Sequence, residues 1–199
     1  MRHLVPLALV ALAAGPAVGQ QQTGAAAGNF RLYDMNGKAV QLSDYRGKTV
    51  VLEWNNPECP YVKKHYAGNM QKSQAAAKRD GAVWLTINSG APGKQGHVTG
   101  EQARSYVAGA KAMPAAYLLD PEGKVGRGYA AKTTPHMYII DGKGVLRYQG
   151  GIDDKPTADV ADVAGARNHV LAALGEIKAG KPVSMPETRP YGCSVKYAG

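Results

Sequence analysis

The sequence predicts one α/β domain with a mixed β-sheet, and three observations support this fold class. The chain has 199 residues, of which 44% are hydrophobic and 20% charged, so its composition suits a packed core. Short apolar runs rich in β-branched residues alternate with longer stretches of helical periodicity. No internal repeat and no linker divides the chain. We therefore expect strands and helices that share one layered fold.

The expected strands are short apolar runs, and two pairs of them are joined by turns typical of β-hairpins. Asn36-Gly37 separates the first pair, and the segment 141–144, Asp-Gly-Lys-Gly, separates the last pair. The strands are expected at residues 30–33, 39–42, 49–54, 82–87, 116–119, 135–140 and 145–148.

Three helices are expected between or after these strands. The first begins with Pro60, because proline is well tolerated at the first helical position, and ends at Gly81. The last carries apolar residues at helical spacing and is ended by Gly180 and Pro182. The helices are expected at residues 60–81, 101–113 and 158–179.

The N-terminus resembles a secretory signal peptide. Arg2 precedes the uncharged, mostly apolar segment 4–18, which is too short to span a bilayer. The small residues Ala17 and Gly19 then stand where a signal peptidase would need them, before Gln20. We expect an exported protein, periplasmic or secreted after cleavage near Gly19-Gln20, with no stable membrane anchor.

These features divide the chain into four expected parts. They are a signal peptide (1–19), a flexible segment (20–29), a folded domain (30–181) and a C-terminal tail (182–199) that carries Cys193.

The charge pattern argues against a nucleic-acid partner. Lys and Arg total 24 against 15 acidic residues, which gives a formal net charge of +9. The basic residues are spread along the chain without long blocks, and only one Phe is present to stack on bases. The simpler interpretation is a solubilising surface with some affinity for anions.

The two cysteines, Cys59 and Cys193, are 134 residues apart, so they form neither a CxxC pair nor a local metal knuckle. Export would place them in an oxidising compartment, where they are either a structural disulfide or a reactive pair. The surroundings of Cys59 favour reactivity, because it lies between a buried strand and the N-terminus of a helix. Lys63, one helical turn later, adds a nearby cation, and the neighbouring Glu58 opposes ionisation. We expect Cys59 to be an ionised thiolate that substrates can reach.

A second notable feature is Thr134-Pro135 at the start of a predicted strand. Proline within sheets is confined to edges, bulges and strand starts. The sequence does not decide whether this peptide bond is cis or trans.

Taken in order, these motifs resemble the thioredoxin fold. Within that fold the chain is most similar to redoxins of the alkyl hydroperoxide reductase/thiol-specific antioxidant group, in particular a peroxiredoxin-like branch whose motif reads Cys-Asn-His-Cys-Pro-Tyr-Val. The resemblance covers residues 30–197. It depends on segments 34–37, 44–48, 54–62, 134–135, 141–144 and 192–196.

The chain also departs from the patterns of that group. Asn56 stands where the branch has its first cysteine, which excludes exchange within a CxxC motif. Compared with the peroxiredoxin motif, Asn56 replaces a threonine and Leu52 a proline. Asn56 is a candidate to hydrogen-bond the thiolate or a peroxide oxygen. Lys63 and Arg127 are candidates for the positive partner of the thiolate.

The resemblance implies a two-thiol mechanism without a cofactor. Cys59 would attack a peroxide or an oxidised partner thiol, and Cys193 would resolve the product as a disulfide, within one chain or across a homodimer. An external thiol reductant would then restore both thiols. In this scheme Pro60, Thr134 and Pro135 complete the site around Cys59.

Two other classes of function stay open on the sequence alone. A copper-binding protein would use Cys59 with His136 and Met137, because soft sulfur and imidazole suit copper. A non-catalytic redoxin would use Cys59–Cys193 as a permanent disulfide on a partner-binding module. A catalytic pair should be reduced readily, whereas a structural disulfide should resist mild reductant.

Overall fold

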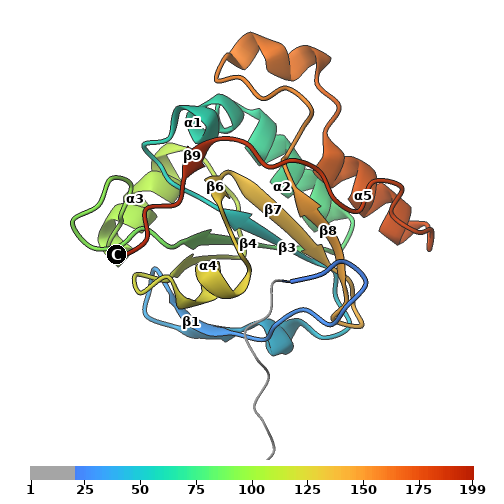
Figure 1. Ribbon diagram of the computed structural model, residues 1–199, viewed down its shortest axis with the longest axis horizontal. Helices are drawn as coiled ribbons and strands as arrows, with labels where there is room; N and C mark the ends of the chain where they lie inside the picture. The colour runs from blue at the N-terminus through green and yellow to red at the C-terminus, as the bar shows by residue number, and fades with distance from the viewer. Residues whose placement is uncertain (1–20) are drawn as a thin grey trace, which may run out of the picture.

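A computed structural model describes residues 21–199, and the expected signal peptide 1–19 lies outside the described residues. The described chain folds around a seven-stranded sheet in the order β2-β1-β5-β4-β3-β7-β8, and a two-stranded sheet joins β6 to β9 (Figure 1). The strands are β1 (Arg31–Asp34), β2 (Ala39–Gln41), β3 (Val50–Trp54), β4 (Val83–Asn88), β5 (Ala116–Leu119), β6 (Thr133–Thr134), β7 (His136–Ile140), β8 (Leu146–Gly150) and β9 (Cys193–Ser194). The helices are α1 (Pro60–Tyr66), α2 (Asn69–Arg79), α3 (Gly100–Gly109), α4 (Lys124–Gly128) and α5 (His169–Lys178), with short 3-10 helices at Leu42–Tyr45 (η1) and Val160–Gly165 (η2).

The sheet is mixed, as the sequence predicted. Strands β3, β4 and β5 are parallel neighbours, while β7, β8 and the β1–β2 hairpin pair antiparallel to their neighbours. The hairpin forms one edge of the main sheet. This arrangement confirms the thioredoxin-like fold with an N-terminal hairpin.

Alternate residues of the central strands pack into two cores on opposite faces of the sheet. On one face Val51, Trp84 and Ile139 pack against α2 and α5. On the other face Leu52 and Tyr138 pack with residues of the N-terminal segment and of the region around α4. Burial on both faces explains why β3 and β4 are mostly apolar in the sequence, without a strict alternation of apolar and polar residues.

Two of the predicted helices are broken, which corrects the sequence interpretation. The helix expected at 60–81 divides into α1 and α2 at Gly68, whose φ of +130° interrupts the helical backbone. The helix expected at 158–179 divides into η2 and α5, because Asn168 caps α5 by accepting from the Leu171 amide at 2.9 Å. None of the η2 residues is buried, so the apolar spacing in this segment does not correspond to a helix face that packs on the core.

Smaller differences concern short elements. Helix α3 ends at Gly109 instead of residue 113, and Lys111, just beyond it, has a φ of 51°. The sequence pattern did not predict α4, β6 or β9, all of five residues or fewer. Among them β6 and β9 matter most, because they join the C-terminal tail to the region of Thr134-Pro135.

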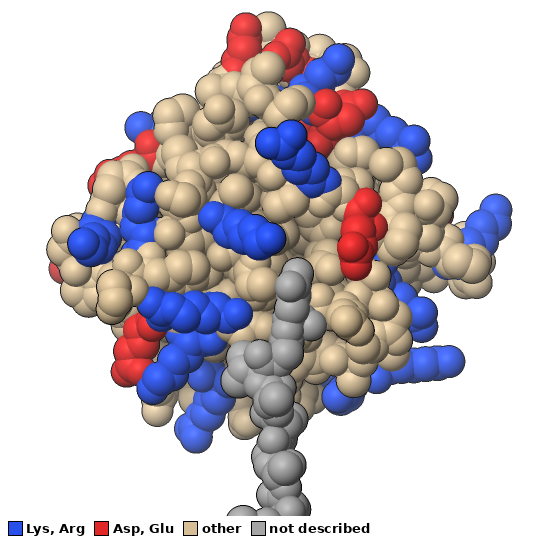
Figure 2. All heavy atoms as spheres, viewed as in Figure 1, with Lys and Arg blue, Asp and Glu red and all other residues tan. Residues whose placement is uncertain are grey.

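The surface carries its charges in dispersed form. On the face shown in Figure 2, the described Lys and Arg side chains are interspersed with acidic and uncharged residues and do not form one continuous stripe. Within residues 21–199, no helix has both the length and the apolar character needed to cross a membrane.

Candidate active site

Cys59 lies where the sequence predicted it, between a core strand and the N-terminus of a helix. It is the N-cap residue of α1, with φ −69° and ψ 125°, and Pro60 occupies the first helical position. The carbonyl of Cys59 accepts the first helical hydrogen bond from the Lys63 amide at 2.9 Å. The sulfur therefore lies beside unpaired helical amides at the positive end of the helix.

Thr134-Pro135 lies directly against this sulfur. The peptide bond between the two residues is cis. The Thr134 carbonyl accepts a hydrogen bond from the Cys59 thiol, with 3.1 Å between sulfur and oxygen. Although these residues are 75 positions apart, the antiparallel pairing of β3 with β7 brings them together.

The C-terminal tail brings Cys193 to the same place. Strand β9 pairs antiparallel with β6, so that Cys193 is opposite Thr134. The Thr134 hydroxyl donates to the Cys193 carbonyl at 3.4 Å. Both cysteines are free thiols. The fold therefore gathers Cys59, Thr134, Pro135 and Cys193, four of the predicted site residues, around one point.

The two thiols differ in acidity. Burial raises the pKa of Cys59, but hydrogen bonds from the Cys193 thiol, the Val62 amide and Thr134 outweigh it and hold this pKa below the ordinary value of 9.0. Burial and the adjacent Cys59 raise the pKa of Cys193 to about 11. Cys59 is therefore the more readily ionised sulfur, and Cys193 is the thiol that donates a hydrogen bond to it.

The accessibility of Cys59 differs from the expectation. Its exposed fraction is 0%, so the predicted reachable thiolate is covered in this conformation. Thr134 contacts the sulfur directly, and the tail contributes to the cover because β9 crosses the site beside Thr134 (Figure 1). A substrate can reach Cys59 only after local movement of this cover.

Neither candidate cation lies at the sulfur. Lys63 is exposed on α1. The Arg127 guanidinium donates to the carbonyls of Glu122 and Ala198 and packs on the Tyr197 ring, so it holds the end of the tail. Hydrogen bonds, not an ion pair with either side chain, stabilise the thiolate.

Asn56 makes contacts other than the predicted one. Its side-chain nitrogen donates to Gln95 at 2.9 Å, and its oxygen accepts from the Glu58 amide at 2.9 Å. These bonds order the loop that precedes Cys59. Asn56 thus supports the backbone at the site, and its bond to a thiolate or peroxide stays a prediction.

The ligand set of the copper alternative does not come together. His136 and Met137 are neighbours on β7, so their side chains point to opposite faces of the sheet. Met137 packs in the core beside α2 and α5. In residues 21–199, no group of three or more His, Cys, Asp or Glu side chains could hold a metal ion.

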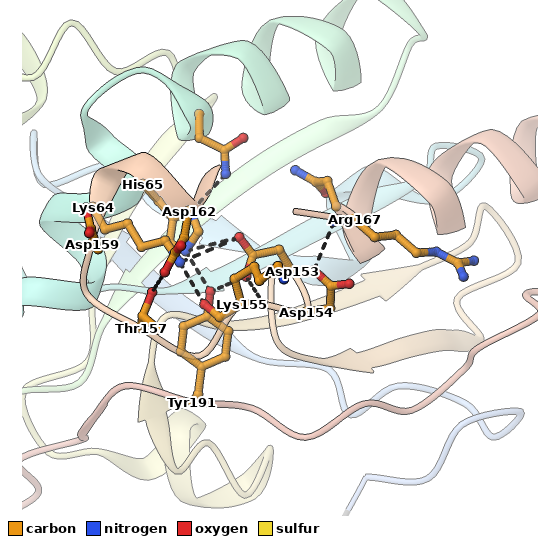
Figure 3. Close-up of polar contacts among 12 residues, drawn as sticks. Lys64, His65, Asp153, Asp154, Lys155, Thr157, Asp159, Asp162, Arg167 and Tyr191 are labelled. Carbon is orange, nitrogen blue, oxygen red and sulfur yellow. Dashed lines mark hydrogen bonds and ion pairs between the residues drawn. The ribbon is translucent and has the colours of Figure 1, made fainter. Parts of the chain in front are cut away.

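Two buried polar clusters near the site were not predictable as clusters from the sequence. One surrounds Glu53 on β3. The other joins Lys64, His65 and Asp153 to Tyr191 of the tail (Figure 3). No motif marks either cluster. The only signal for the first was a charged residue, Glu53, inside an otherwise apolar run, and the second had none.

The fold and the two cysteines gathered beside Thr134 define a thioredoxin-fold redoxin. The chain belongs to the AhpC/TSA family, whose model matches residues 23–149. This match confirms the resemblance drawn from the sequence, and it ends before the tail that carries Cys193.

Similar proteins agree with this assignment. The chain is 31% identical over 148 residues to a chloroplastic peroxiredoxin Q of Triticum aestivum, a match that covers 69% of this chain but only 63% of the wheat protein. A hypothetical protein from Sinorhizobium meliloti 1021 has a similar structure, with a TM-score of 0.76 at 22% identity over 91% of this chain and 97% of that one. A thiol:disulfide interchange protein described as DsbE from Chlorobium tepidum matches with a TM-score of 0.57 at 27% identity, over 78% of this chain and 100% of that chain.

Proposed function

We propose that this protein reduces peroxides with Cys59 as the attacking thiolate and Cys193 as the resolving thiol, and that it does so outside the cytoplasm after export. Membership of the AhpC/TSA family and the likeness to a peroxiredoxin Q support the reaction class. The proposal of export depends on the signal-like segment at residues 4–18.

The first step oxidises Cys59. Its thiolate attacks one peroxide oxygen, an S–O bond forms and the O–O bond breaks. The electron pair leaves on the other oxygen, which takes a proton and departs as water or an alcohol. Cys59 becomes a sulfenic acid. The lowered pKa of Cys59 favours this step because the thiolate is the nucleophile.

The second step joins the two cysteines. The Cys193 sulfur attacks the Cys59 sulfur, the S–S bond forms and the S–O bond breaks. The hydroxide leaves with the Cys193 proton as water, so the step needs no further reactant. An external thiol reductant then restores both cysteines and is itself oxidised. The partly exposed Cys193 offers that reductant a sulfur at the surface.

One observation carries the proposal: the β6–β9 pairing sets Cys193 opposite Thr134, whose carbonyl contacts the Cys59 sulfur. Because this pairing lies within one chain, we expect an intramolecular disulfide and not one across a homodimer.

The test treats the reduced protein with one equivalent of hydrogen peroxide and maps its peptides by mass spectrometry. We expect a Cys59–Cys193 disulfide in a monomeric chain. Cys193→Ser should stop at a dimedone-reactive sulfenic acid on Cys59, and Cys59→Ser should consume no peroxide.

Three results would count against parts of this proposal. Absence of both sulfenic acid and disulfide would refute peroxide reduction. Turnover of disulfide substrates alone would assign the site to thiol–disulfide exchange. Disulfide-linked dimers on a non-reducing gel would refute resolution within one chain.

A further inference from the structure

Tyr191, two residues before Cys193, packs against α1 and so connects the tail to that helix. Its ring lies edge-on to the Tyr61 ring, with 5.9 Å between centroids. The Lys64 ammonium lies 5.6 Å from the centre of the same ring. The tail therefore contacts the helix that begins at Cys59 through both aromatic and cationic groups.

The Tyr191 hydroxyl lies within a directional series of hydrogen bonds (Figure 3). Burial lowers the pKa of His65 to about 4, so this imidazole is neutral. The Asn69 amide nitrogen donates to His65 Nδ1 at 2.8 Å, which leaves Nε2 as the protonated nitrogen. Nε2 donates to the Tyr191 oxygen at 2.9 Å, and the tyrosine hydroxyl donates to Asp153 Oδ1.

The charges beneath Tyr191 balance within the protein. Lys64 and Asp153 are both buried, with 3.9 Å between Nζ and Oδ2, and Nζ also donates to the Lys155 carbonyl at 2.7 Å. Asp153 Oδ2 has no hydrogen-bond partner within residues 21–199. The cluster therefore has one strong, geometrically fixed contact to the tail, through the Tyr191 hydroxyl.

We propose that Tyr191 is a positioning residue that latches the tail onto the Lys64–His65–Asp153 cluster and thereby sets Cys193 against Cys59. The latched tail covers Cys59 and keeps the resolving sulfur in place; release of the latch uncovers Cys59 and removes its partner. The resolving role in this inference rests on the proposed function. The covering role does not, because it follows from burial and contacts alone.

The primary test compares alkylation of Cys59 by iodoacetamide in Cys193→Ser and in Cys193→Ser/Tyr191→Phe. Phenylalanine keeps the ring and removes only the hydroxyl. Loss of a hydrogen bond to a charged group should shift the tail toward release, so we expect Cys59 to react about tenfold faster. Tyr33→Phe, which removes an exposed hydroxyl on β1, is the matched control and should leave the rate unchanged.

A second measurement follows disulfide formation after peroxide is mixed with the otherwise wild-type Tyr191→Phe protein. We expect Cys59 sulfenic acid to form at least as fast as in the wild type and the disulfide to form about tenfold more slowly. If Tyr191 had a structural role alone, its substitution would lower the free energy of unfolding but would not slow disulfide formation relative to sulfenic acid formation.

The outcomes distinguish the two proposals. Unchanged alkylation in Tyr191→Phe overturns the latch, and so does disulfide formation at the wild-type rate. If the wild type forms no disulfide with peroxide while Tyr191→Phe still accelerates alkylation, the latch stands and the proposed function fails.

Discussion

At the scale of single residues, Gly192 shows how closely the tail approaches the site. Its φ is +129°, and a Cβ at this position would lie 2.1 Å from the Thr134 oxygen. That oxygen is also the acceptor for the Cys59 thiol. Only a residue without a side chain allows the tail to lie this close.

We therefore expect Gly192→Ala to displace the tail. The clash and the positive φ should lower the free energy of unfolding by about 1–3 kcal/mol and increase alkylation of Cys59. Urea unfolding and iodoacetamide labelling check this. Gly175→Ala is the control, because it lies within α5 where an added methyl group would meet no other atom within 4 Å, and should be neutral or slightly stabilising. Equal stability of the two variants would contradict the close approach.

At the scale of elements, the Glu53 carboxyl ties β3 to its neighbours. It accepts from Trp84 at 2.8 Å and Thr86 at 3.0 Å on β4, and from Tyr66 at 2.8 Å on α1. Asn55, just after β3, donates at 3.0 Å. Complete burial outweighs these bonds and raises the pKa of Glu53 above 4.5.

The raised pKa fixes the sign of a pH effect. Glu53 contributes stability that is present below the unfolded pKa of 4.5 and is lost as pH rises through the folded pKa. The side chain introduced by Glu53→Gln does not titrate. Its NH2 group would face two of the hydrogen-bond donors from which the carboxyl now accepts, and this should lower the free energy of unfolding by about 1–3 kcal/mol. We expect the variant to be less stable in acid and the difference to shrink as pH rises.

Urea unfolding of both proteins at several pH values measures this difference. Glu122→Gln is a control with the opposite sign. The Lys124 ammonium lowers the pKa of exposed Glu122, so the stability of the wild type relative to this variant should increase slightly as pH rises. A Glu53→Gln difference that widens with pH would show that the folded state prefers the ionised carboxylate.

At the scale of the whole molecule, buried neutral histidines limit stability in acid. Burial lowers the pKa of His65 to about 4 and that of His136 to about 3, from 6.5. Such groups contribute stability above pH 6.5 that is lost as pH falls through the folded pKa. Protonation of either imidazole in the folded state should lower the free energy of unfolding by on the order of 3 kcal/mol.

We expect the free energy of unfolding to fall steadily as the pH drops from 6.5 toward 4. His136→Asn keeps a side-chain acceptor for the Lys132 amide but does not ionise, so its free energy of unfolding should fall less steeply as the pH drops. Unfolding followed by Trp fluorescence across this range checks the comparison. Parallel curves for the two proteins would show that His136 does not contribute.

The sequence predicted the parts of this molecule that depend on local pattern. The strands around Cys59, the hairpin turns and the placement of Pro60 follow from apolar runs and turn residues, and the structure has them all. The broken helices were not predictable from periodicity, because Gly68 and Asn168 interrupt the backbone without interrupting the apolar spacing.

The candidate site was predictable only in part. Cys59 and Thr134-Pro135 have local signals, and family resemblance supplied Cys193. The contacts of the tail have no local signal in the sequence. Strand β9 is only two residues long, and the hydrogen bond between Tyr191 and His65 joins residues 126 positions apart. Pairings over such distances depend on the finished fold and leave no periodic trace in the sequence.

The β6–β9 pairing also has a consequence for the order in which the protein is made. A ribosome adds Cys193 134 residues after Cys59. While the chain is being synthesised, the strand–helix unit that holds Cys59 is complete before the segment that covers it exists. The newly made chain therefore carries its nucleophilic sulfur before the tail segment that packs over it has been added, and the finished enclosure of that sulfur requires the last residues of the chain.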